Sequence, residues 1–264
     1  MIRATLSIFK NIFENRKLLV QFSFNDFKSK YAGSAVGIVW AFITPLVTVL
    51  TYWFVFSQIR ARGADESYPF IVYLVTGLIP WFFFSDSLLS ATNVFREYSY
   101  LVKKVVFNVQ ILPTSKILSS LYTHLFFILI GFGITSLSGI FPTLKALQLI
   151  YYLFCLIIFL TGVTWLTAST QPFLPDIMQF INVAMQTIMW TLPILWSPSG
   201  WIEKLLKINP LYYVVQGYRD SFTNGPWFWE HWQYGLYFWG FTIILLLAGS
   251  VVFRRLKPHF SDVL

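Results

Sequence analysis

The stretch YAGSAVGIVWAFITPLVTVLTYWFVFSQI, residues 31–59, contains no charged side chain. About 20 apolar residues are enough for a helix to cross a bilayer, so a run of 29 uncharged residues predicts a membrane-spanning helix. Gly33, Ser34 and Gly37 stand at its start, Pro45 lies mid-span, and aromatic residues crowd its end. Small residues allow helices to approach closely, so we expect tight packing at the start of this segment.

Uncharged stretches recur along the rest of the 264-residue chain, which is 56% hydrophobic and only 11% charged. Soluble domains rarely have this balance. The sequence therefore predicts an all-α integral membrane protein, with residues 1–264 forming a single transmembrane domain. We expect six membrane-spanning helices, at roughly 35–57, 70–91, 114–137, 146–169, 177–196 and 232–253.

The net charge of +8 is explained by membrane orientation rather than by nucleic-acid binding. Six spans put both termini on one side of the membrane. If that side is the cytoplasm, 13 of the 19 Lys and Arg residues lie on cytoplasmic segments. The excess of positive charge predicts that both termini lie inside the cell.

Three segments outside the spans have patterns that simple connections do not need. Residues 5–30 predict an amphipathic helix at the inner membrane surface, acting as an anchor or as a docking surface for a partner or a lipid headgroup. Its apolar side is expected to carry Phe9, Phe13, Val20, Phe24 and Phe27.

The second of these segments, residues 92–113, lies on the cytoplasmic side and is basic and aromatic. It predicts a short helix that offers Tyr98, Leu101 and Phe107 to a partner, or else the end of a long helix with snorkelling lysines. The third segment, residues 197–230, lies outside and is apolar but interrupted by Pro and Gly. It predicts a half-inserted, re-entrant hairpin of two short helices, or an aromatic belt at the interface.

Residues for catalysis, metal binding or nucleotide binding are not apparent in the sequence. It contains no G-x-x-x-x-G-K-[ST] motif, its three histidines are far apart, and Cys155 is its single cysteine. Asp86, the acid nearest the interior of a span, is expected to face a cavity or a helix end. Lys116 is expected to snorkel to the interface, and His124 to be a hydrogen-bonded core residue.

These features favour a transport pathway that another protein drives. A membrane enzyme acting on lipid-linked sugars would need converging acid, base or metal-binding residues. An ion-coupled carrier would use carboxylates inside the membrane, which are scarce here.

Five motifs, in order along nearly the whole chain, resemble the permeases of type-2 ABC exporters for polysaccharides such as O-antigen, capsular polysaccharide and teichoic acid. They occupy residues 30–56, 73–85 with the element GLIPWFFF, 101–113, 193–198 and 209–219. Two positions depart from the family pattern: Asn108 stands where a proline usually follows Phe107, and Pro175-Asp176 where Arg-Asp is usual.

The resemblance implies a homodimer of the chain in the bacterial cytoplasmic membrane, with two cytoplasmic ATPase subunits that bind ATP and Mg. The chain itself would hold no cofactor and would export a lipid-linked polysaccharide of the teichoic acid or O-antigen type. Residues 97–107, here called the coupling segment, would contact the ATPase through Glu97, Tyr98, Leu101, Lys103, Lys104 and Phe107.

Aromatic side chains are expected to line the substrate path, because their faces contact sugar C–H groups while letting a polymer slide. The candidates are Trp40, Trp53, Phe54, Trp81, Phe82, Trp190 and Trp196, each of which is also compatible with lipid contact or helix packing. The resemblance further implies an outer gate containing Asn209, Pro210, Tyr212, Tyr213, Tyr218 and Arg219. Arg219 is expected either to guide phosphates or to anchor the chain at the interface.

Overall fold

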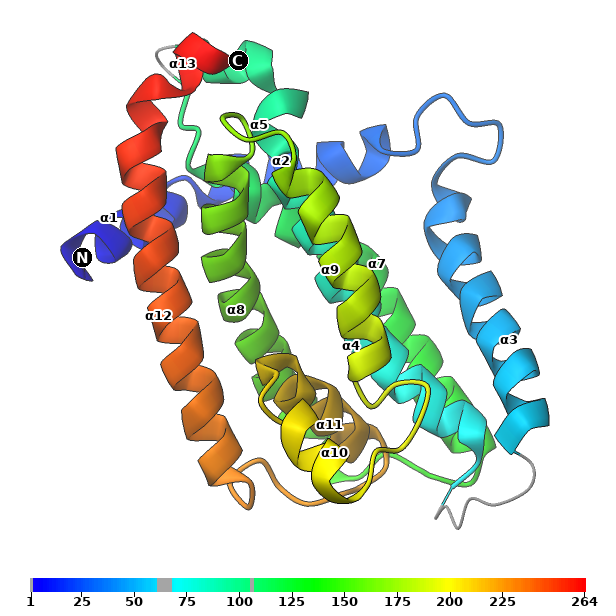
Figure 1. The fold of residues 1–264 in the computed structure, drawn as a ribbon. Coiled ribbons are helices and arrows are strands. Elements are labelled where there is room, and N and C mark those ends of the chain that lie inside the picture. Colours follow the sequence, from blue (N-terminus) through cyan, green and yellow to red (C-terminus); the bar gives the residue numbers. More distant parts are fainter. Residues whose placement is uncertain (1, 61–67, 105–106) are drawn as a thin grey trace.

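The structure, a computed structural model, describes residues 2–60, 68–104 and 107–264. Within these ranges every regular element is helical (Figure 1), as the sequence predicts. The α-helices are α1 (Ile2–Glu14), α2 (Arg16–Ser29), α3 (Trp40–Arg60), α4 (Phe70–Thr92), α5 (Val94–Glu97), α6 (Ser99–Val102), α7 (Ile111–Leu137), α8 (Gln148–Thr170), α9 (Ile177–Thr191), α10 (Gly200–Leu206), α11 (Pro210–Phe222), α12 (Trp232–Leu256) and α13 (Phe260–Val263). Short 3₁₀ turns are η1 (Gly37–Val39), η2 (Leu144–Leu147) and η3 (Lys257–His259).

Five segments among the described residues are long and apolar enough to cross a membrane. They contain α3, α4, α7, α8 and α12, and run over Gly37–Gln58, Phe70–Thr92, Ile111–Leu137, Leu144–Thr170 and Trp232–Val263. These segments match five of the six predicted spans, with ends that differ by three residues or fewer except in the last, which continues to Val263.

The remaining predicted span, 177–196, is helical only as far as Thr191. At 1.5 Å per residue, the 15 residues of α9 extend about 22 Å, less than the roughly 30 Å of a bilayer core. The helix ends because Pro193 disfavours the helical conformation at the residue before it, and Leu192 is extended with φ −85° and ψ 151°. A sixth complete span is therefore not confirmed.

Helix α4 is the centre of the bundle and contacts α3, α7, α8, α9 and α11. Most of its side chains are buried, including the run from Val72 to Trp81. Helix α3 lies at the edge of the bundle, and only 11% of its span is buried within the chain. Its apolar surface must therefore face lipid or another protein.

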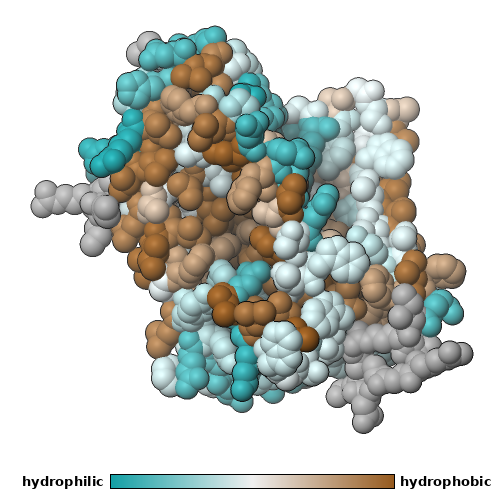
Figure 2. All heavy atoms as spheres, in the orientation of Figure 1, coloured by the Kyte–Doolittle hydropathy of each residue, from teal (hydrophilic) through white to brown (hydrophobic). Residues whose placement is uncertain are grey.

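The two ends of the bundle differ in what they carry (Figure 1). Helices α10 and α11 lie at one end, called the α11 end, while α5 and α13 lie at the opposite end, called the α13 end. Hydrophobic residues cover much of the middle of the face in Figure 2, and hydrophilic residues gather toward both ends. This banding fits a molecule that crosses a membrane along the bundle axis.

The predicted amphipathic helix over 5–30 is two helices, α1 and α2, separated at Asn15. The side-chain amide of Asn15 donates from Nδ2 to the Asn11 backbone carbonyl oxygen at 2.8 Å. Of the residues on the predicted apolar side, Phe27 is buried and Phe9 packs against another ring, whereas Phe13, Val20 and Phe24 are exposed. Exposed aromatic side chains on an amphipathic helix suit the membrane interface.

The expected close packing at Gly33, Ser34 and Gly37 is wrong within this chain. All three lie in the irregular connection that ends at η1, and a Cβ added to either glycine would have no atom within 4 Å. Gly33 and Gly37 have φ of +94° and +59°, values that side chains disfavour. These glycines therefore turn the chain between α2 and α3.

Lys116 does not snorkel, because it is only 5% exposed and lies in an ion cluster. Its Nζ is 2.6 Å from Asp26 Oδ1 and 2.7 Å from Glu97 Oε1. The Tyr98 hydroxyl donates to the same Asp26 oxygen at 2.6 Å. This ion cluster joins α2, α7 and the coupling segment, because each contributes a side chain.

A second ion pair joins the end of α2 to the centre of the bundle. Lys30 pairs with Asp86 of α4, and Ser120 of α7 donates to the other Asp86 oxygen at 2.6 Å. Asp86 also lines a cavity, as the sequence predicts. The amphipathic segment is thus fixed to both α4 and α7 by charged groups.

Replacing Lys116 with Met should destabilise the protein by about 3–5 kcal/mol, because it leaves the Asp26 carboxylate buried without its cation. Denaturation in detergent would measure the loss. Combining Lys116→Met with Asp26→Asn should recover part of it, since the buried charge is then removed. Lys103→Met, at an exposed lysine, is the matched control, and equal stability of Lys116→Met and the unsubstituted protein would contradict the prediction.

Candidate functional site

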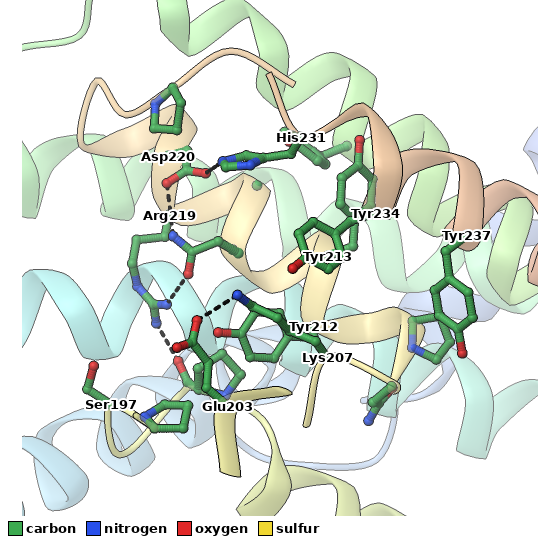
Figure 3. A pocket seen from close by; sticks show the side chains of 18 of the residues that line it. Ser197, Glu203, Lys207, Tyr212, Tyr213, Arg219, Asp220, His231, Tyr234 and Tyr237 are labelled. Carbon is green, nitrogen blue, oxygen red and sulfur yellow. Dashed lines mark hydrogen bonds and ion pairs between the residues drawn. The ribbon is translucent and has the colours of Figure 1, made fainter. Parts of the chain in front are cut away.

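A pocket of about 450 Å³ lies at the α11 end, and we call it the tyrosine pocket (Figure 3). Its walls come from α10, α11, the start of α12 and the connection between α9 and α10. Seven tyrosines line it: Tyr68, Tyr73, Tyr152, Tyr212, Tyr213, Tyr234 and Tyr237. Its volume is in the range of sites that bind small molecules.

Helix α11 begins beside the pocket, because the residues at its start favour helix initiation there. Asn209 caps α11, its Oδ1 accepting from the Leu211 backbone N–H at 3.0 Å, and Pro210 occupies the first helical position. Helical spacing then places Tyr213, Gln216 and Asp220 on the side that lines the pocket. Val214 and Phe222 are buried in the core of the bundle.

Arg219 is buried, with 2% of its surface exposed, and it holds the connection that follows α9. Its Nη2 donates to the carbonyl oxygens of Pro193 at 2.5 Å and Tyr73 at 3.3 Å. Its Nη1 donates to Gln216 Oε1 at 3.1 Å, and its guanidinium lies 3.7 Å from the centre of the Tyr73 ring. The expectation that Arg219 is an interface anchor is therefore wrong, because the side chain is buried among protein groups.

Helix α4 and the connection after α9 approach each other closely beside Arg219. A Cβ at Gly77 would lie 3.2 Å from Arg219 Nη2 and 3.3 Å from the Cα of Ile194. The Tyr73 hydroxyl also donates to the Trp196 carbonyl oxygen at 2.8 Å. Non-helical backbone in a membrane protein needs such internal partners, and Arg219 and Tyr73 supply them.

Asp220 lies next to Arg219 and is 5% exposed. Its Oδ1 accepts from Gln216 Nε2 at 2.9 Å, while its Oδ2 has no hydrogen-bond partner and lies 4.0 Å from His231 Nε2. Burial raises the pKa of Asp220 to about 6, although the Gln216 hydrogen bond opposes the shift. The pocket thus contains a buried carboxylate oxygen with an unused hydrogen-bonding position.

Lys207 and Glu203 form an ion pair at the edge of the tyrosine pocket, with Nζ and Oε1 2.7 Å apart (Figure 3). The Lys207 ammonium also lies 5.2 Å from the Tyr234 ring centre and 5.9 Å from the Tyr212 ring centre. The lysine charge is therefore already engaged by a carboxylate and lies near two aromatic faces.

The structure brings five of the six predicted gate residues together around the tyrosine pocket: Asn209, Pro210, Tyr212, Tyr213 and Arg219. Tyr218 points elsewhere, because it is fully buried and its hydroxyl lies 2.9 Å from His124 Nε2. This contact confirms His124 as a hydrogen-bonded core residue. Whether any of these residues form a gate stays a prediction.

Sequence reasoning misses several residues of the pocket, namely Glu203, Lys207, Gln216, Asp220, His231, Tyr234 and Tyr237. The polar positions 216, 219 and 220 recur at spacings of three and four in an otherwise apolar helix, which is the signal that would have found part of the set. The pocket residues on α12, Tyr234 and Tyr237, are brought to the pocket by packing between segments that are distant in the sequence.

The predicted pathway aromatics do not gather in one place within the chain. Trp40 and Phe82 line a second cavity of about 330 Å³, the α3–α4 cavity, together with Lys30, Asp86 and residues of α7. Trp53, Phe54 and Trp190 are exposed, and Trp81 is only 6% exposed in the core. Half-buried Trp196 donates from Nε1 to the Trp190 carbonyl oxygen at 2.9 Å.

The coupling segment contains the last residue of α5 and the whole of α6, and residues 105–106 lie outside the described residues. Tyr98 packs on Phe22 with ring centres 5.0 Å apart, and Phe107 lies 6.3 Å from the same ring. Lys103 and Lys104 are exposed, Leu101 is half-buried, and Glu97 reaches Lys116. The lysines are thus available to a partner, whereas Tyr98 already holds α2.

A family model described as ABC-2 type transporter matches residues 18–223. Over 252 residues, the chain is 28% identical to the O-antigen export system permease protein RfbA of Klebsiella pneumoniae, covering 94% of this chain and 95% of that protein. It is 21% identical over 266 residues to the protein of the same name from Myxococcus xanthus, covering 97% and 99% of the two chains.

Replacing Arg219 with Lys should destabilise the protein by about 1–3 kcal/mol for each buried acceptor left unpaired, because an ammonium cannot reproduce the guanidinium fork. Thermal denaturation in detergent would measure the effect. Arg255→Lys, at an exposed position in the last turn of α12, is the control and should leave stability unchanged. Equal melting temperatures for the two variants would contradict this role for Arg219.

Proposed function

Because the chain belongs to the ABC-2 type transporter family, we propose that two copies of it and two cytoplasmic ATPase subunits form an exporter for a lipid-linked polysaccharide. The chain is the transmembrane permease subunit of a polysaccharide exporter in the bacterial inner membrane, and not an enzyme. The observation that carries this conclusion is the family match over residues 18–223. The names of the two relatives favour an O-antigen-type polymer as the substrate.

The ATPase subunit is proposed to bind at the α13 end. The chain has no P-loop motif, so ATP and Mg would be bound by the partner. The coupling segment lies between α4 and α7 and presents exposed Lys103 and Lys104. The ion cluster links this segment to α2 and α7, so a displacement of the segment would also displace both helices.

We also propose that the α13 end faces the cytoplasm and the α11 end faces outside. The distribution of Lys and Arg supports this orientation. Helix α9 and the buried connection after it would then approach the outer surface, with α10 and α11 as the re-entrant hairpin. A second copy would cover part of α3, which is largely unburied within one chain.

Reconstitution tests the proposed function directly. The chain, purified with a P-loop ATPase subunit and placed in lipid vesicles, should move a lipid-linked O-antigen polymer across the membrane when ATP is supplied. Vanadate should stop both ATP hydrolysis and movement. ATP-independent movement driven by an ion gradient would instead support a carrier.

Reversing the charge of Lys103 and Lys104 with Glu should lower export and the ATPase activity of the complex at least tenfold, because it replaces the exposed basic surface that is proposed to contact the partner with an acidic one. Vanadate-sensitive hydrolysis and polymer export would be measured on the reconstituted complex. Arg254→Glu with Arg255→Glu alters two exposed basic residues at the same end and serves as the control. Normal activity of the variant with Glu at 103 and 104 would contradict the proposed role of Lys103 and Lys104 in coupling.

Alanine at Trp40 or Phe82 should reduce polymer export several-fold, because these two predicted pathway residues line the α3–α4 cavity. The amount of polymer exported per ATP hydrolysed would report the effect. Phe141→Ala, at an exposed aromatic between α7 and α8, is the control. The aromatic path would be refuted if alanine at all seven predicted positions left export untouched.

A further inference from the structure

The tyrosine pocket has walls that suit a sugar ring. Tyrosine offers an apolar face to the C–H side of a sugar and a hydroxyl at its edge. The Tyr212 and Tyr234 rings lie near the same Lys207 ammonium, and both side chains line the pocket. Tyr234 is 39% exposed, so part of its ring is accessible from outside the protein.

Lys207 and Arg219, the lysine and arginine of the pocket, are already engaged by protein groups, and His231 Nε2 lies 4.0 Å from Asp220 Oδ2. Lys207 pairs with Glu203 at 2.7 Å. Both terminal nitrogens of Arg219 donate to oxygen atoms of the protein, and only its buried Nε lacks a partner. A phosphate entering the pocket would therefore meet few available positive charges and the carboxylates of Glu203 and Asp220.

The unused hydrogen-bonding capacity of the pocket instead matches a hydroxyl group. Asp220 Oδ2 is a buried acceptor without a hydrogen-bond partner, and His231 Nε2 is 4.0 Å away, beyond hydrogen-bond distance. A sugar hydroxyl both donates and accepts, whereas an ionised phosphate oxygen only accepts. Buried polar groups in proteins normally have partners, so this carboxylate oxygen points to a ligand with hydroxyl groups.

We infer that the tyrosine pocket binds one neutral sugar unit of the exported glycan, with Asp220 Oδ2 accepting a hydrogen bond from a sugar hydroxyl and the Tyr212 and Tyr234 rings contacting its C–H faces. The source of the sugar rests on the proposed export function. The site lies at the end of the bundle opposite the coupling segment, where a polymer would leave the protein.

Binding can be measured on the purified full chain in lipid nanodiscs by saturation-transfer NMR. The probes are the methyl glycosides of glucose, galactose, mannose and N-acetylglucosamine, with glucose 1-phosphate as the charged comparison. At least one neutral glycoside should bind with an affinity on the order of millimolar, as expected for a single sugar. Asp220→Asn and Tyr234→Ala should each weaken that binding about tenfold or more, since each removes one contact.

Two further variants separate binding from folding. Tyr234→Phe keeps the ring and should keep the affinity within about twofold, a difference well below 1 kcal/mol. Asp262→Asn, in α13 at the other end of the molecule, should leave binding unchanged. Binding to no neutral glycoside, equal binding by Asp220→Asn, or tighter binding of glucose 1-phosphate would each overturn the inference.

The failure of this inference can be distinguished from failure of the proposed function. A reconstituted complex that exports polymer while the chain binds no neutral glycoside would overturn the sugar site alone. A chain that binds glycosides at this pocket but supports no ATP-driven export would overturn the exporter and leave the site.

Discussion

The α11 end of the structure depends on the hydrogen bond from the Arg219 guanidinium to the Pro193 carbonyl oxygen. Proline stops α9 while the backbone after it is still buried, and a buried carbonyl oxygen without a donor is costly. One guanidinium serves this oxygen and the Tyr73 carbonyl, and it stacks on the Tyr73 ring. Because Arg219 lies on α11, the same contact fixes α11 against α4 and sets the wall of the tyrosine pocket.

Helix α4 connects this contact to the opposite end of the molecule. Its first half carries Tyr73, which holds the connection after α9, and its second half carries Asp86, which pairs with Lys30. The two residues are separated by about 20 Å of helix, most of it buried. The buried cation Lys116 then joins α2 to the coupling segment. The amphipathic segment and the tyrosine pocket are therefore linked through a single continuous helix, α4, which contains Pro80.

The sequence predicts the long helices well, because a membrane span depends mainly on a local property, the length of an uncharged run. It also predicts two short helices between 197 and 230, since Pro and Gly interrupt an apolar segment there. The errors fall where distant segments decide the outcome. Lys116 is buried because Asp26 and Glu97 approach it from other elements, and Arg219 is buried because α4 and the connection after α9 close around it. The end of α9 is different, because Pro193 could have predicted it locally.

The same pairing that stabilises the tyrosine pocket limits how strongly it can hold a polymer. Lys207 and Arg219 already interact with protein groups. A sugar in the pocket would therefore contact one carboxylate oxygen, aromatic faces and hydroxyl groups. Single hydrogen bonds and ring contacts of this kind contribute about 1 kcal/mol each. A long glycan presents the same groups again with every repeat unit. Weak contacts that re-form as the chain advances favour sliding, whereas a site with free cations would retain a phosphate and impede the units behind it.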